Sequence, residues 1–222
     1  MAIHTQLGRI PRHIGFIPDG NRRWAVARGL QKRAGYAAGI EPGLRLIDMC
    51  RELGVEEVSA YGFTKENVRR PSDQVACFRE ACAEFALAAL DAGVALLAVG
   101  DTRSELFPDA LRPFSQTRSP GDIRFNLLVN YGWEWDLAQA CAAPRGPGRG
   151  RPAFLNVLGS RGVSRVDLVV RWGGRRRLSG FLPIQCAYAD FCTIDTLWPD
   201  MRLEEAREAL AWYCGQDVTM GG

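Results

Sequence analysis

The hydrophobic residues of this chain recur with two different spacings. Some segments are apolar at nearly every position, which is typical of strands buried on both faces of a sheet. These predicted strands span residues 13–17, 58–63, 94–99, 123–130 and 166–170, with a weaker one at 191–194. Other segments repeat apolar side chains every third or fourth position, as amphipathic helices do. These predicted helices span residues 37–53, 74–92, 133–142, 181–190 and 203–213.

Strands and helices alternate along the chain, and this order indicates an α/β fold. We expect a central, mostly parallel six-stranded sheet with helices on both faces. The 222 residues fit a single domain over 1–222, because neither an internal repeat nor a second core is visible. The region 143–164 interrupts the pattern, and its first part, 143–152 (APRGPGRGRP), predicts a surface loop.

Polar side chains follow four of the predicted strands. In an open α/β sheet, ligands bind beyond the carboxyl ends of the strands. The segments that follow those ends are 18–24 (PDGNRRW), 64–71 (TKENVRRP), 130–132 (NYG) and 171–179 (RWGGRRRLS). Arginine, amide, hydroxyl and carboxylate groups are therefore expected to meet at one edge, which favours a ligand with several anionic oxygens.

The last of these segments combines arginines with a pair of glycines. Arg171 and Arg177 flank the pair at 173–174, where the backbone can approach a ligand closely. Planar guanidinium groups suit phosphate. Ser179 is predicted to cap the helix that follows it, and a helix N-terminus also favours phosphate. Two alternatives stay open: the arginine run is a solvated surface, or Arg171 forms a structural ion pair.

Asp19 follows the first predicted strand directly and precedes Gly20. A carboxylate beside incoming phosphates is repelled unless a cation bridges the two. Mg²⁺ is the natural bridge, because it commonly binds one or two carboxylates together with phosphate oxygens. Alternatively, Asp19 caps a helix that starts near Asn21. The chain has neither a Walker A loop nor a DDxxD cluster, which disfavours nucleotide hydrolysis and the aspartate-rich type of prenyl synthase.

Composition excludes several further classes. The only histidines are His4 and His13, so no three-histidine metal site can form. Seven cysteines without a CxxC motif indicate free thiols in a reducing cytoplasm. Lysine occurs only at positions 32 and 65, so 26 of the 28 basic residues are arginine, yet the net charge is only +3. We therefore expect a cytoplasmic protein with no nucleic-acid partner, and with no membrane span because no apolar run is long enough.

Four stretches resemble one known family in order and spacing. They are HIGFIPDGNRRWAVARGL from residue 13, AYGFTKENVRRPSDQV from residue 60, NYGWEWD from residue 130 and DLVVRWGGRRRLSGFLPIQCAYADFCTIDTLWPD from residue 167. The chain resembles the cis-prenyltransferase family, which includes undecaprenyl diphosphate synthase. The resemblance implies a homodimer with an apolar tunnel between sheet and helices. Such enzymes join an allylic diphosphate to a homoallylic one with Mg²⁺ and release pyrophosphate.

The resemblance also assigns roles to individual residues. Asp19 is implied as the catalytic aspartate and a metal ligand, and Asn67 as the residue near the proton that leaves. Asp190 matches the second metal position, where the family usually has glutamate. The implied substrate-binding residues of the first two motifs are Gly20, Asn21, Arg22, Arg23, Trp24, Lys32, Tyr36, Thr64, Glu66 and Arg70. The implied residues of the second diphosphate site are Arg171, Arg175, Arg177 and Ser179.

Several substrate positions depart from the family pattern. Tyr36 stands where a histidine is usual, and Lys32 and Val68 replace an arginine and an aromatic residue. Arg175 replaces the glutamate of the usual GGE, which reverses the charge in the loop of the second diphosphate. The tail at 214–222 lacks the family's arginines.

These departures favour a divergent member that makes a short product. We expect it to couple dimethylallyl diphosphate to an allylic diphosphate such as geranyl diphosphate, head-to-middle, as lavandulyl-type synthases do. The bulky Phe78 and Phe85 on a predicted helix also favour a small product. The alternatives are regular cis-elongation with isopentenyl diphosphate, a non-catalytic partner subunit and an arginine-rich nucleic-acid binder. The substrate pair, product length, double-bond geometry and any cyclisation stay open.

Overall fold

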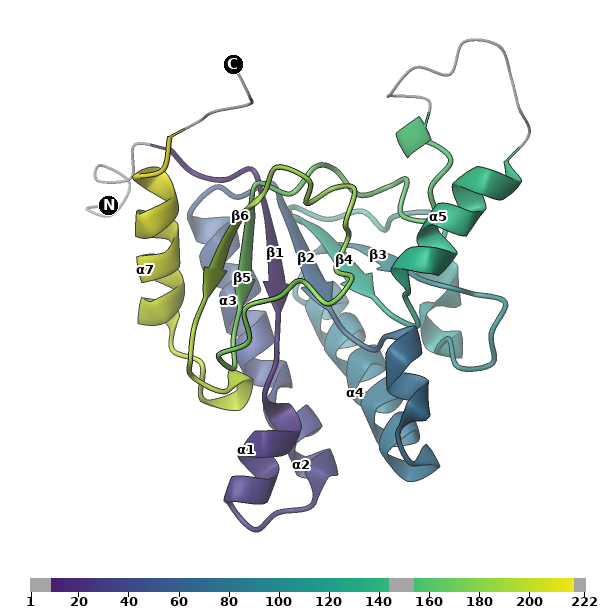
Figure 1. Cartoon of the computed structure of the whole chain (residues 1–222), viewed down its shortest axis with the longest axis horizontal. Coiled ribbons are helices and arrows are strands. Elements are labelled where there is room, and N and C mark those ends of the chain that lie inside the picture. Colours follow the sequence, from purple (N-terminus) through teal and green to yellow (C-terminus); the bar gives the residue numbers. More distant parts are fainter. Residues whose placement is uncertain (1–8, 144–153, 218–222) are drawn as a thin grey trace.

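The computed structural model of the chain describes residues 9–143 and 154–217. Its centre is one six-stranded sheet in the order β3-β4-β2-β1-β5-β6, with parallel pairing throughout (Figure 1). The strands are β1 (His13–Ile17), β2 (Glu57–Tyr61), β3 (Ala95–Val99), β4 (Arg124–Leu128), β5 (Leu168–Arg171) and β6 (Asp190–Thr193). The predicted α/β class and mostly parallel sheet are confirmed.

Helices and short 3-10 turns connect the strands. The helices are α1 (Asn21–Ala27), α2 (Lys32–Ala38), α3 (Ile40–Glu52), α4 (Ser72–Asp91), α5 (Trp133–Ala142) and α7 (Leu203–Cys214). The 3-10 turns are η1 (Lys65–Arg69), η2 (Asp109–Phe114) and η3 (Trp198–Asp200). Within the described ranges, no helix has the length and hydrophobicity needed to cross a lipid bilayer.

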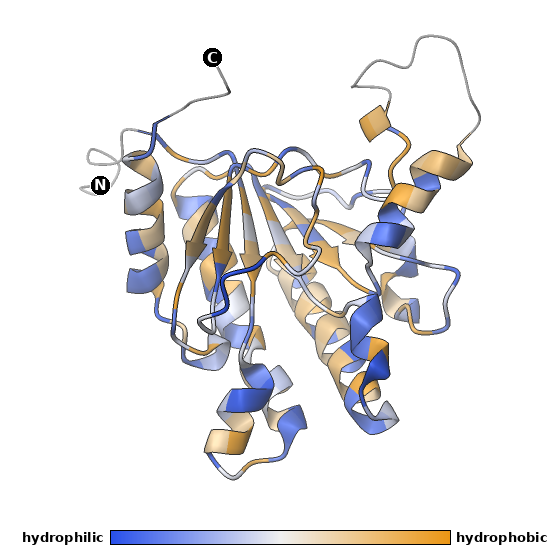
Figure 2. Ribbon diagram, viewed as in Figure 1, coloured by the Kyte–Doolittle hydropathy of each residue, from blue (hydrophilic) through white to orange (hydrophobic). Residues whose placement is uncertain are grey.

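Alternate residues of each strand point to opposite faces of the sheet, and both faces are covered. Phe16 and Val58 lie in a large core with residues of α3, α4 and α7. Ile17 and Tyr61 point the other way, into a smaller core that contains Phe181. Figure 2 shows hydrophobic strands at the centre and hydrophilic colours mainly on the surrounding helices and loops. Burial on both faces explains why most strand positions are apolar.

Two predicted helices differ from the structure. The predicted helix 37–53 is divided at Gly39 into α2 and α3. The prediction of a helix at 181–190 is wrong, because the chain there forms turns and then β6. Ser179 and Leu182 have positive φ angles of 53° and 39°, and Pro183 lacks the backbone N–H that a helix interior requires. The predicted loop at 143–152 falls almost wholly on residues 144–153, which lie outside the described residues.

A buried polar network holds the amino ends of β1, β2 and β4 together. The side chain of His13, only 1% exposed, contacts Ser59 Oγ through Nε2 at 2.8 Å. Its Nδ1 lies 3.1 Å from the carbonyl oxygen of Arg165. Asn126 Nδ2 donates to both Ser59 Oγ and Glu57 Oε1. These bonds satisfy groups that would otherwise be costly to bury.

This network predicts a pH-dependent stability below pH 6.5. Burial lowers the pKa of His13 below its usual 6.5, so the unfolded chain takes up a proton there while the native ring stays neutral. The free energy of unfolding should therefore fall as the pH drops through 6.5, by about 1.4 kcal/mol for each unit of pKa difference. Urea denaturation at pH 7.5, 6.5 and 5.5 measures the slope. A His13→Asn variant should lose this component, and an unchanged slope would contradict the assignment.

Candidate functional site

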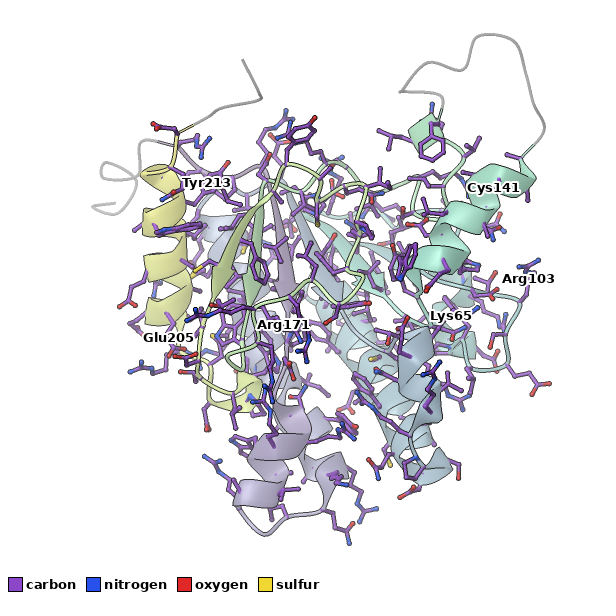
Figure 3. The ribbon with its side chains drawn as sticks, viewed as in Figure 1. Lys65, Arg103, Cys141, Arg171, Glu205 and Tyr213 are labelled. Carbon is purple, nitrogen blue, oxygen red and sulfur yellow. The ribbon has the colours of Figure 1, made fainter. Side chains whose placement is uncertain are left out.

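The carboxyl ends of β1, β2 and β5 open into a cavity of about 1130 Å³. Strand order reverses here, since β2 and β5 lie on either side of β1, and ligands of α/β sheets bind at such points. Figure 3 shows Arg171 at the carboxyl end of β5, near the place where β1 leads into α1. The predicted site residues that line the cavity are Asp19, Gly20, Asn21, Arg22, Arg23, Lys32, Tyr36, Thr64, Glu66, Asn67, Arg70, Arg171, Arg175, Arg177 and Ser179.

A tight turn after β1 places Asp19 in this cavity. The backbone N–H of Asp19 donates to the carbonyl of Ile17 at 2.9 Å, and Gly20 then adopts a φ of 112°. A Cβ at Gly20 would lie 2.8 Å from the side chain of Leu197. The turn thus requires glycine on both conformational and steric grounds. It directs the carboxylate of Asp19 into the cavity, and α1 begins at the next residue, Asn21.

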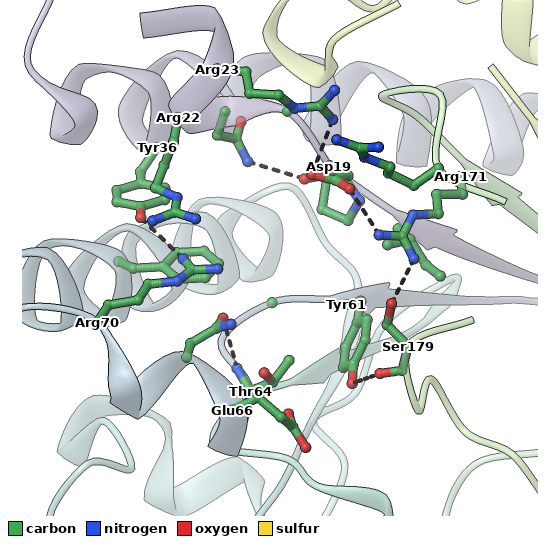
Figure 4. A pocket seen from close by; sticks show the side chains of 18 of the residues that line it. Asp19, Arg22, Arg23, Tyr36, Tyr61, Thr64, Glu66, Arg70, Arg171 and Ser179 are labelled. Atoms are coloured by element: carbon green, nitrogen blue, oxygen red, sulfur yellow. Dashed lines mark hydrogen bonds and ion pairs between the residues drawn. The ribbon is translucent and has the colours of Figure 1, made fainter. Parts of the chain in front are cut away.

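Two arginines hold the carboxylate of Asp19 (Figure 4). Arg171 Nη2 donates to Asp19 Oδ2 at 2.8 Å, and Arg23 Nη2 lies 3.4 Å from Oδ1. Arg171 is 5% exposed, and its Nη1 also donates to Ser179 Oγ at 2.9 Å. The ion pair considered for Arg171 does form, and its partner is Asp19. The partners of the Asp19 carboxylate in the structure are therefore two arginine side chains. Asp19 does not cap α1.

The second motif forms the opposite wall of the cavity. Thr64 N donates to Asn67 Oδ1 at 3.3 Å, and this bond belongs to a capping box that starts η1. Arg70, just after η1, donates from Nη1 to the hydroxyl of Tyr36 at 3.1 Å. Burial lowers the pKa of Arg70 below the usual value of an arginine, while the phenol and a ring contact with Phe78 stabilise the cation. Tyr36 therefore fixes the position of a guanidinium group at the cavity wall.

The loop after β5 provides the third wall. Gly173 and Gly174 have φ angles of 81° and 69°, and Arg23 Nη2 donates to the carbonyl of Gly173 at 2.8 Å. Arg175 and Arg177 line the cavity. Arg176 is exposed and lies outside the lining, so the solvated-surface interpretation fits this one member of the run.

Sequence reasoning placed Trp24 and Asp190 in the site, but neither lines the cavity. Trp24 Nε1 donates instead to Asp200 Oδ1. Asp190 starts β6 and pairs in register with Leu168, at the amino end of the sheet, and its carboxylate lies 3.9 Å from Arg9. Asp19 follows the carboxyl end of β1, so this chain does not bring the two carboxylates together.

Other lining residues were missed. Tyr61, at the end of β2, donates its hydroxyl proton to the carbonyl of Ser179 at 2.8 Å. In the sequence it is indistinguishable from a core residue, because it belongs to an apolar strand. Trp133 and Glu134 line the cavity from the start of α5. Both residues follow the carboxyl end of β4 in the sequence, and this position could have predicted them as site residues.

The cavity is electropositive. Seven cationic side chains line it, against three carboxylates, those of Asp19, Glu66 and Glu134. Clusters of guanidinium groups in a cleft concentrate anionic ligands there. Among the described residues, no group of three or more His, Cys, Asp or Glu side chains is arranged to hold a metal ion. A divalent cation at Asp19 would thus take further ligands from substrate oxygens and water, which is an environment that Mg²⁺ accepts.

A second, apolar cavity of about 50 Å³ adjoins the first, and the two share Asn21, Tyr36, Tyr61 and Phe78 among their lining residues. Its other walls come from α3, α4 and the sheet. Phe85 lines this cavity, and its ring packs edge-on against the ring of Phe125, with 5.4 Å between the ring centres. The site therefore offers arginines to anionic oxygens and, beside them, aromatic and aliphatic side chains to an apolar group.

The parallel sheet and the paired cationic and apolar cavities define an α/β protein that binds an amphiphilic anion. Residues 17–221 match the family described as "Putative undecaprenyl diphosphate synthase". The chain belongs to this family of prenyltransferases, and the resemblance found in its sequence is confirmed. It is a prenyl diphosphate synthase of the cis-prenyltransferase type, a transferase of prenyl groups.

Individual relatives agree with this assignment. The chain is 34% identical over 230 residues to the Pseudomonas putida ditrans,polycis-undecaprenyl-diphosphate synthase ((2E,6E)-farnesyl-diphosphate specific), covering 96% of this chain and 91% of that protein. It is 32% identical to the isoprenyl transferase of Heliobacterium mobile, covering 96% and 88%. The crystal structure of lavandulyl diphosphate synthase from Lavandula x intermedia, in complex with dimethylallyl diphosphate, superposes with a TM-score of 0.84 over 96% of this chain and 99% of that one. At 24% identity, that likeness shows the shared fold.

The geometry predicts that Arg171 is required for binding diphosphate groups. In Arg171→Ala, Asp19 loses its 2.8 Å partner and Ser179 loses its donor, so that Arg23, at 3.4 Å, alone offsets the charge of this carboxylate toward the ligand. Affinity for inorganic pyrophosphate, measured by isothermal titration calorimetry with Mg²⁺, should fall about tenfold or more. Arg207→Ala removes an arginine of α7 outside the cavity lining and should leave the affinity unchanged. Equal affinities in the two variants would refute the prediction.

Proposed function

We propose that this chain is a Mg²⁺-dependent prenyl diphosphate synthase that joins a short allylic diphosphate to a second C5 diphosphate. The observation that carries the proposal is the place of Asp19, between arginines of two different walls and close to an apolar cavity. Arg22 of α1 and Arg70 of the second motif line one part of the cavity, and Arg171 and Arg177 line another. The cavity thus offers guanidinium groups for two diphosphates on either side of one carboxylate.

We assign the first part of the cavity to the allylic diphosphate. Arg22, Arg23 and Arg70, together with Lys32 and the turn at 19–21, would hold its phosphate oxygens. When the allylic C–O bond breaks, the electron pair moves onto the diphosphate. Preorganised cations stabilise that developing charge more than they stabilise the ground state. The carbocation left behind lies toward Tyr61 and Phe78, whose rings exclude water from it.

The second diphosphate is assigned to Arg171, Arg175, Arg177 and Ser179. Held there, its double bond would face the allylic carbon, so that the new C–C bond forms and a proton then leaves. Asn67 lies in the opposite wall, with its amide oxygen bonded to Thr64 N. An amide is not a base, so Asn67 would orient the reacting group while a phosphate oxygen accepts the proton.

Mg²⁺ would be held by Asp19 and by oxygens of the diphosphates. When bound, it supplies positive charge to the leaving group and offsets the repulsion between Asp19 and the phosphates. We assign no role to Asp190 in the cavity of its own chain, because it lies at the other end of the sheet. We further propose that the chain acts as one domain over 1–222, as a homodimer and in the cytoplasm.

The coupling is proposed to be irregular, head-to-middle, between dimethylallyl diphosphate and an allylic diphosphate such as geranyl diphosphate. Arg175 supports this, because it faces the cavity at the position where the family usually has glutamate. A cation there changes how the second diphosphate lies and thereby which carbon meets the allylic cation. Regular head-to-tail elongation with isopentenyl diphosphate is the alternative. A non-catalytic subunit is disfavoured by the complete set of polar groups around Asp19.

Product analysis with defined substrate pairs tests the proposal. Purified protein with Mg²⁺ is given dimethylallyl diphosphate alone, with geranyl diphosphate or with isopentenyl diphosphate, and products are identified by mass spectrometry. We expect a branched C10 or C15 product without isopentenyl diphosphate, no product from Asp19→Ala, and a shift toward linear product in Arg175→Glu. A long linear product that forms only with isopentenyl diphosphate would establish regular elongation instead. If the wild-type chain turned over none of these substrate pairs, the proposed synthase activity would be refuted.

Phe85 is predicted to limit product length. A Cβ placed on Gly43 would lie 2.7 Å from the Phe85 ring, so α3 and α4 leave no space beyond it. Phe85→Ala should extend the apolar cavity and increase the largest product by at least one C5 unit, as measured by chromatography of dephosphorylated products. Leu87→Ala changes an exposed position of the same helix and should leave the distribution unchanged. An unaltered distribution in Phe85→Ala would assign the limit to another side chain.

A further inference from the structure

Helix α1 carries Arg22 and Arg23 but has little stability of its own. It is seven residues long, is preceded by Gly20 and has no side-chain hydrogen bond at its N-cap. Helices of this length are not stable in isolation. The position of α1 must therefore come from contacts with the rest of the fold.

One such contact is with α2. A Cβ placed on Gly35 would lie 2.0 Å from the carbonyl oxygen of Asn21, so the two helices touch through their backbones. The pair projects beyond the carboxyl edge of the sheet (Figure 1). This contact holds α1 to α2, but it does not by itself attach the pair to the sheet. Two bonds already described, Arg23 to Gly173 and Arg70 to Tyr36, tie the pair to other walls of the cavity.

A further attachment comes from η3, far along the chain. Trp198 N donates to the carbonyl of Asp19 at 3.0 Å, and its indole N–H donates to the carbonyl of Gly39 at 2.7 Å. Its ring packs edge-on against Trp172 at 4.9 Å and stacks on Phe16 at 5.6 Å. Trp198 thus fixes the start of α1 and the end of α2 to the core.

The last residue of η3, Asp200, holds the exposed side of α1. Trp24 Nε1 donates to Asp200 Oδ1 at 2.7 Å, and Arg28 Nη2 lies 3.1 and 3.0 Å from the two carboxylate oxygens. The guanidinium of Arg28 also lies 4.4 Å from the centre of the Trp24 ring. These three side chains form one cluster outside the cavity lining, so they act on the cavity only through the backbone of α1.

We propose that Asp200 is a positioning residue that latches α1 and thereby sets the affinity for the first, allylic diphosphate. The inference rests on the assignment of Arg22 and Arg23 to that diphosphate. The groups of the other subsite, Arg171 and Ser179, bond to each other and belong to β5 and its loop. In the part of the chain that the structure describes, helix α1 reaches this second subsite only through Arg23, which bonds to the carbonyl of Gly173 and pairs with Asp19. Release of the latch should therefore weaken the first subsite much more than the second.

Steady-state kinetics separates this role from a general loss of structure. Asp200→Asn keeps an oxygen for Trp24 but removes the charge that pairs with Arg28, and Asp200→Ala removes both interactions. We expect KM for the allylic substrate to rise about threefold in the first variant and about tenfold in the second. KM for the second substrate should stay within a factor of two. Asp109→Asn, which breaks an exposed Asp–Arg pair of 2.7 Å in η2, is the matched control and should change neither value.

A readout without turnover tests the latch independently of the proposed reaction. Arg28, Lys32 and Arg33 are exposed, so trypsin cleavage at 28–33 and hydrogen exchange over 21–38 report the opening of α1. Both should accelerate about fivefold in Asp200→Ala relative to Asp109→Asn. Trp24→Phe loses only the indole donor and should accelerate cleavage and exchange by a smaller factor. This variant still tests the latch if Asp200→Ala does not fold.

The outcomes are distinguishable. Faster exchange in the Asp200 variants, together with weaker binding of inorganic pyrophosphate, supports the latch even if no substrate pair is turned over. Unchanged exchange and cleavage in both Asp200→Ala and Trp24→Phe overturns it. An equal rise of KM for both substrates also overturns it, because the effect would then not be confined to the subsite of α1.

Discussion

The ion pair between Asp19 and Arg171 joins the neighbouring strands β1 and β5 at the edge of the sheet where the cavity opens. In a parallel sheet, neighbouring strands end side by side, and the register pairs Ile17 with Arg171. A carboxylate two residues beyond one strand therefore meets a guanidinium on the next. The pair neutralises both charges in a half-buried place, and Ser179 and Arg23 extend it into two walls. This contact therefore connects the arginines on either side of Asp19.

The two ends of the sheet use buried polar groups differently. At the amino end, the side chains of Glu57 and His13 are fully buried. Their hydrogen-bonding groups are satisfied by residues of neighbouring strands and by Ser164. At the carboxyl end, Asp19 keeps about a third of its side chain exposed. Polar groups that satisfy one another hold a fold together, whereas those left partly open can exchange a protein partner for a ligand. The asymmetry places recognition at one edge and structural support at the other.

The sequence was sufficient for the sheet and for most of the cavity lining, because both depend on periodicity and on strand ends. A helix that starts near Asn21, where α1 begins, was considered only as an alternative for Asp19, because α1 is too short to show a helical period. The turns at 181–189 were not predicted. There the apolar positions Phe181, Leu182 and Cys186 contact the sheet without forming a helix. Trp24 and Asp190 were expected in the site but do not line the cavity of this chain, because a motif gives spacing along the chain and not the direction of a side chain. Tyr61 was missed because a strand-end residue at a cavity has the same residue type as one in the core.

The latch at η3 also has a consequence for the order of events during synthesis. Trp24 and Asp200 are 176 positions apart, and Asp19 and Arg171 are 152 apart. The first residues of the cavity therefore leave the ribosome long before the segments that hold them. Until β5 and η3 emerge, a stretch with five basic residues and no acidic one, 20–38, has none of these partners. Contacts of such long range form late and slow the folding of a chain. The cavity therefore cannot be completed before nearly the whole chain, as far as η3, has been synthesised.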